Sequence, residues 1–127
     1  MMRFIKFLSI AVMFAAGPTC AQDLSGPQKN AVRSAREYLD IGAFSRAGLI
    51  EQLSASYLEG YDLADAKVAV DSLDIDWNSQ AVRSAKDYLN ISGFSCRGLI
   101  KQLSASEGSK FTPSQAASGA KQAGACH

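Results

Sequence analysis

Histidine is almost absent from this sequence, since His127 is the only one among 127 residues. The chain therefore has no HExxH motif and no histidine-rich metal cluster, and a Ser-His-Asp triad would depend on a residue in a terminus that we expect to fray. The carboxylates and hydroxyl groups form no nucleophile-base constellation that packing and helix capping do not explain. We expect no enzymatic activity, no metal and no cofactor.

Long apolar runs are also few, and the one candidate lies near the start of the chain. Residues 7–16 are mainly apolar, follow two basic residues and precede a Gly-Pro pair. This order is typical of a secretory signal peptide, and the run is shorter than the roughly 20 residues that span a bilayer. We expect residues 1–21 to be removed after Ala21, and the mature chain to be periplasmic or secreted with no transmembrane segment.

Cys20 offers a competing interpretation, in which the chain is a lipoprotein anchored to the membrane through this cysteine. The three residues before it are Gly17, Pro18 and Thr19. They fit poorly with the small residues after a leucine that usually precede a lipid-modified cysteine. A free exported protein is the favoured prediction, and a lipid anchor at Cys20 is the alternative.

The sequence repeats itself. Of the 27 positions from 30 to 56, 18 are identical to the position 50 residues later. Chance does not produce this agreement, so the chain contains an internal duplication. It predicts a short linker at 22–29, a first unit at 30–77 and a second unit at 78–127.

Apolar residues recur with a helical period inside each unit. In the first unit, Val32, Ala35 and Leu39 occupy one face of a first helix. Ser45 is placed to cap a second helix, for which Gly60 is the expected stop.

A third helix is expected to begin at equivalent positions, Asp62 and Thr112. In the second unit, Thr112-Pro113-Ser114-Gln115 is a capping box with proline at the first helical position. Three short helices joined by turns too short for a β-crossover predict a helix-turn-helix type of unit. The expected fold is all-α, with tandem duplicated three-helix units.

Charge is balanced in total and separated along the chain. Without Arg3 and Lys6, eleven of the thirteen basic side chains remain against twelve acidic ones, a net charge of −1. Residues 30–77 hold four basic and nine acidic side chains, and residues 80–127 hold six and two. This balance and the expected export argue against nucleic acid as a partner, although helix-turn-helix units often bind DNA.

Acidic side chains of the first unit form the candidate partner-binding set. They would attract a basic segment of a partner and speed its encounter, with strong salt dependence. The alternative is a solvated helical surface, and Asp62 and Asp76 also stand where helix N-caps belong. The candidate partner-binding residues are Glu51, Glu59, Asp65, Asp71 and Asp74.

The residues common to both units form a spaced pattern that core packing alone can also explain. In the first unit it includes Phe-Ser-x-x-Gly-Leu-Ile-x-Gln-Leu-Ser, and Asp76-Trp77-Asn78 links the units. The pattern resembles the Ltp family of host cell surface-exposed lipoproteins over about residues 30–123. The motif residues are Tyr38, Phe44, Ser45, Gly48, Leu49, Gln52, Leu53 and Trp77, then Tyr88, Phe94, Ser95, Gly98, Leu99, Gln102, Leu103, Thr112 and Gln115.

This resemblance implies a tandem helix-turn-helix fold and, as in phage-encoded members, superinfection exclusion. Such a protein is made by a resident prophage, sits outside the cytoplasmic membrane, engages the tape measure protein of an incoming tailed phage and stops DNA injection. The family alone does not fix the function. The alternatives are a housekeeping cell-envelope module that binds peptidoglycan or an exported protein, and a secreted enzyme inhibitor.

The second unit departs from the first in its third helix. Four larger apolar side chains of the first unit are replaced by serine or alanine, and Ala69 is replaced by Gly119. Large-to-small changes cost roughly 1–4 kcal/mol each when buried. We expect this helix to dock weakly unless something else holds it.

Two cysteines are placed to hold it. Cys96 and Cys126 stand at the positions that Arg46 and Asp76 occupy in the first unit. The correspondence predicts a Cys96–Cys126 disulfide where the first unit has an ion pair, and the alternative is two independent thiols. Closing this loop would stabilise the fold by roughly 3–4 kcal/mol.

Overall fold

The computed structural model describes residues 23–127, which form six α-helices and no strand. The all-α prediction is confirmed, while the predicted signal peptide and Cys20 lie outside the described residues. The helices are α1 (Gly26–Ile41), α2 (Arg46–Ser54), α3 (Leu63–Ser72), α4 (Trp77–Ile91), α5 (Cys96–Ser104) and α6 (Pro113–Gln122).

Side-chain caps set the starts of the helices. The predicted capping box is present, because Thr112 accepts a hydrogen bond from the Gln115 amide at 3.2 Å and Gln115 accepts one from the Thr112 amide at 3.1 Å. Ser25 and Gln28 form a second capping box. It corrects the predicted linker at 22–29, because α1 already begins at Gly26.

The second helix of the first unit ends before the residue that its glycine, Gly60, predicts. α2 ends at Ser54 and is followed by the extended Ala55. The Tyr61 amide then donates to the Leu53 carbonyl at 2.8 Å, which reverses the chain. Gly60 lies in this reversal with a φ of 69°, so its glycine serves a left-handed turn and not a helix end.

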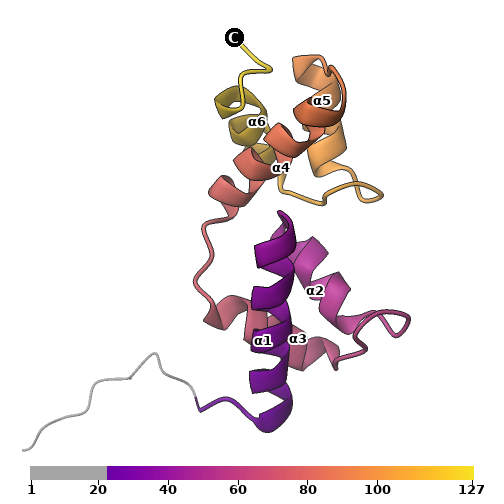
Figure 1. The fold of residues 1–127 in the computed structure, drawn as a ribbon, viewed down its shortest axis with the longest axis vertical. Helices are drawn as coiled ribbons and strands as arrows, with labels where there is room; N and C mark the ends of the chain where they lie inside the picture. The colour runs from indigo at the N-terminus through magenta and orange to yellow at the C-terminus, as the bar shows by residue number, and fades with distance from the viewer. Residues whose placement is uncertain (1–22) are drawn as a thin grey trace, which may run out of the picture.

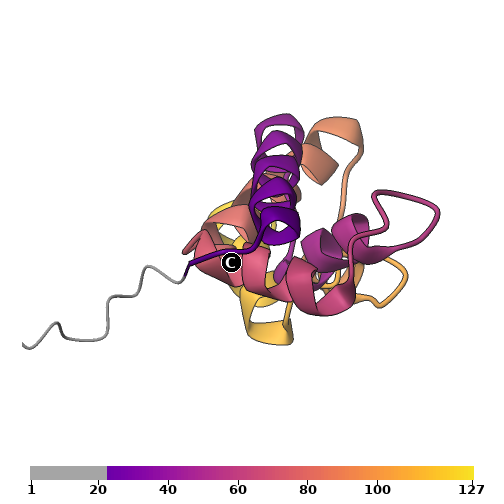
Figure 2. The same cartoon turned by 90° about the horizontal axis from the view of Figure 1, so that it is seen from below.

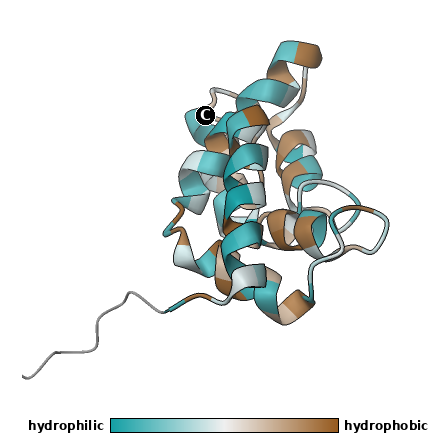
Figure 3. Ribbon diagram, turned by 60° about the horizontal axis from the view of Figure 1, so that its bottom comes forward, coloured by the Kyte–Doolittle hydropathy of each residue, from teal (hydrophilic) through white to brown (hydrophobic). Residues whose placement is uncertain are grey.

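Each unit packs two short helices against its longer first helix (Figure 1). Leu49 and Leu53 of α2 are fully buried, as are Leu99 and Leu103 of α5. Hydrophilic and hydrophobic residues alternate along the helices (Figure 3), as expected for helices that bury one side. The aromatic motif residues pack edge to face in equivalent pairs, Tyr38 with Phe44 and Tyr88 with Phe94. Most of the repeated motif is therefore core.

The helix α6 lies close against α4, and its small side chains make this approach possible. Ala116, Gly119 and Ala120 are buried against it. A Cβ atom on Gly119 would lie only 2.8 Å from the carbonyl carbon and oxygen of Ala81, so this approach requires glycine. The small residues thus let two helix backbones pack directly. The weakness of this docking in the absence of a further constraint stays a prediction.

The two units stack end to end (Figures 1 and 2). An Arg83 guanidinium nitrogen donates to the Leu39 carbonyl at 2.7 Å, in the last turn of α1 where carbonyls lack helical partners. The Gln80 side chain accepts a hydrogen bond from the Phe44 amide at 3.1 Å. This stacking places the acidic first unit and the basic second unit at opposite ends of the molecule.

Candidate functional site

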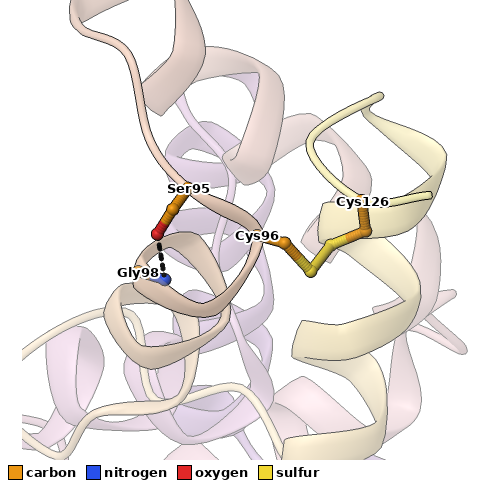
Figure 4. The surroundings of a disulfide bond; sticks show 4 residues. All are labelled: Ser95, Cys96, Gly98 and Cys126. Atoms are coloured by element: carbon orange, nitrogen blue, oxygen red, sulfur yellow. Dashed lines mark hydrogen bonds between the residues drawn. A yellow bond between two sulfur atoms is a disulfide. The ribbon is translucent and has the colours of Figure 1, made fainter.

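Cys96 and Cys126 are joined by a disulfide in the structure (Figure 4). Their Cα atoms are 4.8 Å apart, within the range that a disulfide spans. Cys96 is the first residue of α5, where Ser95 caps the helix by accepting a hydrogen bond from the Gly98 amide. Cys126 follows α6, so the bridge ties the end of this small-residue helix to α5.

The equivalent ion pair in the first unit is not formed, which corrects the predicted pairing of Arg46 with Asp76. Arg46 instead binds the carboxylate of Asp71 with two nitrogens, at 2.7 and 2.9 Å. Asp76 is the N-cap of α4 and accepts a hydrogen bond from the Ser79 amide at 3.1 Å. The long arginine side chain thus reaches a carboxylate five residues before the position equivalent to Cys126.

Two of the five candidate partner-binding carboxylates have basic partners. The Arg46 guanidinium lowers the pKa of Asp71, and Asp71 raises the pKa of Arg46. Glu51 pairs with Lys110 of the second unit. These two carboxylates are therefore already partly neutralised by the protein itself.

The other three carboxylates differ in their surroundings. Glu59 is exposed and accepts a hydrogen bond from the Tyr38 hydroxyl at 2.6 Å, which raises the pKa of Tyr38. Asp65 accepts a hydrogen bond from the Gln28 amide group at 3.1 Å. Asp74 has a φ of 51° and lies in the turn between α3 and α4. The five candidates thus lie on several elements, namely α2, the loop after it, α3 and the turn that follows α3.

The structure adds apolar side chains to this acidic region that the charge pattern does not reveal. Tyr57 and Leu58, in the loop between α2 and α3, are 76% and 44% exposed, and Leu63 at the start of α3 is 53% exposed. The signal in the sequence is their replacement in the second unit by Glu107, Gly108 and Pro113.

A hollow of about 280 Å³ lies between the units, beside this loop. Phe44, Gly48 and Leu58 line it from the first unit, and Ser109 and Lys110 line it from the second. Ser45 at its edge is 1% exposed. The hollow is open, and it mixes apolar and charged walls.

Neither a metal site nor a membrane span emerges from residues 23–127. Histidine, cysteine and acidic side chains in this part of the chain form no group of three or more that could hold a metal ion. None of its helices is long and apolar enough to cross a membrane.

The fold and the repeated motif match known proteins. The solved structure of Ltp, a superinfection exclusion protein from the Streptococcus thermophilus temperate phage TP-J34, is 26% identical, with a TM-score of 0.68, over 77% of this chain and 96% of that chain. No curated protein sequence matches. The family of host cell surface-exposed lipoproteins, Lipoprotein_Ltp, matches residues 27–73 and 76–117. With one match in each of the two units, the chain belongs to the Ltp family.

Proposed function

We propose that this protein is an exported, non-enzymatic superinfection exclusion protein that blocks DNA injection by other tailed phages, by binding the tape measure protein of the incoming phage. One observation carries the proposal. The solved Ltp structure, which comes from a superinfection exclusion protein, is matched over 96% of its length.

The shape and charge of the molecule are suited to binding a partner, and the proposed mechanism requires no catalysis. The tape measure protein leaves the tail ahead of the DNA, so a protein outside the cytoplasmic membrane that binds it acts before a channel forms. The first unit carries a net charge of −5 and the second +4. Because the units stack end to end, a basic partner segment is drawn to one end of the molecule, at a rate that falls with salt.

The repeat itself supplies variants that test the acidic end. Glu59, Asp62 and Asp65 correspond to Ser109, Thr112 and Gln115 in the second unit. The triple variant Glu59→Ser, Asp62→Thr, Asp65→Gln therefore introduces residues that the same local fold already accepts. The matched control Asp23→Asn, Asp87→Asn, Glu107→Gln removes the same number of carboxylates outside residues 30–77.

The test is the plating efficiency of a panel of tailed phages on cells that express the full chain. Cells that express residues 22–127 without the leader are the control for export, and adsorption is counted in parallel. We expect plating to fall by several orders of magnitude for some phages, with normal adsorption and only with the leader. The acidic-end triple variant should weaken exclusion and the matched control should not.

Each contrary outcome points to a different function. No drop for any phage, with the protein shown to be exported, would refute exclusion and favour a housekeeping envelope module. Reduced adsorption would place the block at the receptor and refute the injection step. Normal exclusion by the acidic-end triple variant would refute the role of the acidic end and leave exclusion standing.

A further inference from the structure

Three large apolar side chains stand close together in sequence on the surface of the first unit. Tyr57, Leu58 and Leu63 account for three of the five large apolar side chains that are prominently exposed among residues 23–127. The other two, Ile41 and Ile91, are equivalent positions of the two units and are both 83% exposed. The three therefore form a distinct group, which we call the apolar anchor. Soluble proteins expose such groups chiefly where they bind something.

Folding does not require the apolar anchor. The second unit folds in the same way with Glu107, Gly108 and Pro113 at the three positions. The turn is also closed by equivalent backbone hydrogen bonds, from the Leu58 amide to the Ala55 carbonyl and from the Gly108 amide to the Ala105 carbonyl. The first unit thus exposes an apolar surface that the second unit lacks and that the fold itself does not use.

A hollow borders one residue of the apolar anchor, and acidic residues flank the anchor in sequence. Leu58 lines the hollow between the units, together with Glu51 and Lys110. The two ion pairs found within residues 23–127 use Arg46 with Asp71 and Glu51 with Lys110. Glu59 and Asp62, which are both exposed and flank the apolar anchor in sequence, are in neither pair. A ligand for this surface must offer apolar groups and positive charge together.

We propose that the apolar anchor is the docking point for a basic amphipathic segment of a partner protein, with its apolar side chains against Tyr57, Leu58 and Leu63 and its lysines or arginines toward Glu59 and Asp62. This inference deepens the proposed function and rests on it for the identity of the partner. The carboxylates steer the encounter, while the apolar contacts set the lifetime of the complex.

One double variant separates this proposal from simple charge attraction. Tyr57→Glu with Leu58→Gly installs the residues of the second unit, so the fold is expected to persist, which circular dichroism checks. The variant removes apolar surface and adds a negative charge. Charge attraction alone therefore predicts tighter binding of a basic peptide, whereas the apolar anchor predicts weaker binding. Ile91→Ser, which removes an equally apolar and more exposed side chain from the other unit, is the matched control.

The assay is fluorescence anisotropy with the full chain and a short labelled Leu/Lys peptide that forms an amphipathic helix. We expect the wild type to bind it, the double variant to bind at least about tenfold more weakly, and Ile91→Ser to bind within about twofold of the wild type. A Glu/Leu peptide of the same pattern should not bind. Equal or tighter binding by the double variant, equal loss in Ile91→Ser, or no binding of the Leu/Lys peptide would overturn the proposal.

Two further measurements distinguish this proposal from self-association of the chain and from the proposed function. Analytical ultracentrifugation tests a second copy of the chain as the occupant, since the basic second unit could supply the charge; self-association that the double variant abolishes would overturn the proposal in favour of that occupant. Phage plating separates it from the proposed function. If the wild type excludes no phage, the proposed function fails while the peptide assay still decides the docking point. If the double variant excludes phages normally, the docking point is wrong and exclusion stands.

Discussion

The glycine at the contact between α4 and α6 provides the sharpest test of how the second unit is built. The two units hold different residues at this equivalent position, Ala69 and Gly119, and both are fully packed in their own setting. By helix propensity alone, Gly119→Ala should stabilise the protein by about 1 kcal/mol. The structure predicts the opposite sign.

The magnitude follows from the contact distances. The new Cβ would lie 2.8 Å from the Ala81 carbonyl carbon and oxygen and 2.9 Å from the Ala81 Cβ. Two of these atoms belong to the backbone of α4 and the third is the Cβ of an alanine, so none of them can rotate away. Removing the clash therefore requires the two helices to separate by roughly half an ångström, which weakens the neighbouring dispersion contacts. Overpacking of this kind costs about 1–3 kcal/mol. Set against the propensity gain, Gly119→Ala should destabilise the protein by about 1 kcal/mol, or lower Tm by about 5 °C.

Thermal and urea unfolding of the oxidised protein, followed by far-UV circular dichroism, measures this change. Gly26→Ala is the control, because this glycine is also helical and a Cβ there meets nothing within 4 Å; it should be neutral or slightly stabilising. The reciprocal Ala69→Gly should destabilise by about 1.5–2 kcal/mol, since it loses a buried methyl group and helix propensity together. A Gly119→Ala variant that is more stable than the wild type would refute the close packing of α6 on α4.

Three other predictions concern the bridge and the charged residues. Serine at both Cys96 and Cys126 should lower the free energy of unfolding by about 3–4 kcal/mol, because a loop with a sequence separation of 30 is freed in the unfolded chain; urea midpoints that do not change on reduction would contradict it. Asp71, whose pKa Arg46 lowers from its usual 3.8, stabilises the folded state at pH values above 3.8 and loses this contribution as the pH falls through the lower folded pKa. Because the pair is about half exposed, Asp71→Asn should cost only a few tenths of a kcal/mol near pH 7, and the difference from the wild type should vanish in strong acid; a constant difference across a pH series of unfolding curves would exclude this pairing. Lys110 has a φ of 60°, so Lys110→Gly should be about 1 kcal/mol more stable than Lys110→Ala, and equal Tm values would show that this backbone is not strained.

The sequence by itself determined the features that depend on local pattern. The duplication, the helical period and the Thr112 capping box each involve residues a few positions apart, so elementary helix geometry was enough to predict them. Comparison of the two units also identified Cys96 and Cys126 as a pair. The prediction is right for the cysteines, although Arg46 and Asp76, the residues at the equivalent positions of the first unit, form no ion pair with each other.

Only the tertiary structure decided the features that depend on how helices pack. Arg46 is long enough to reach several carboxylates, and the docking of α3 on α2 selected Asp71. Gly119 looks like a weak point in sequence, yet it is what allows α6 to approach α4. The exposure of Tyr57 and Leu58 was equally hidden, because an apolar residue in a loop reads the same whether it packs inward or faces solvent. Whether residues far apart in sequence pack or clash depends on differences in distance of a few tenths of an ångström, which no local pattern of the chain encodes.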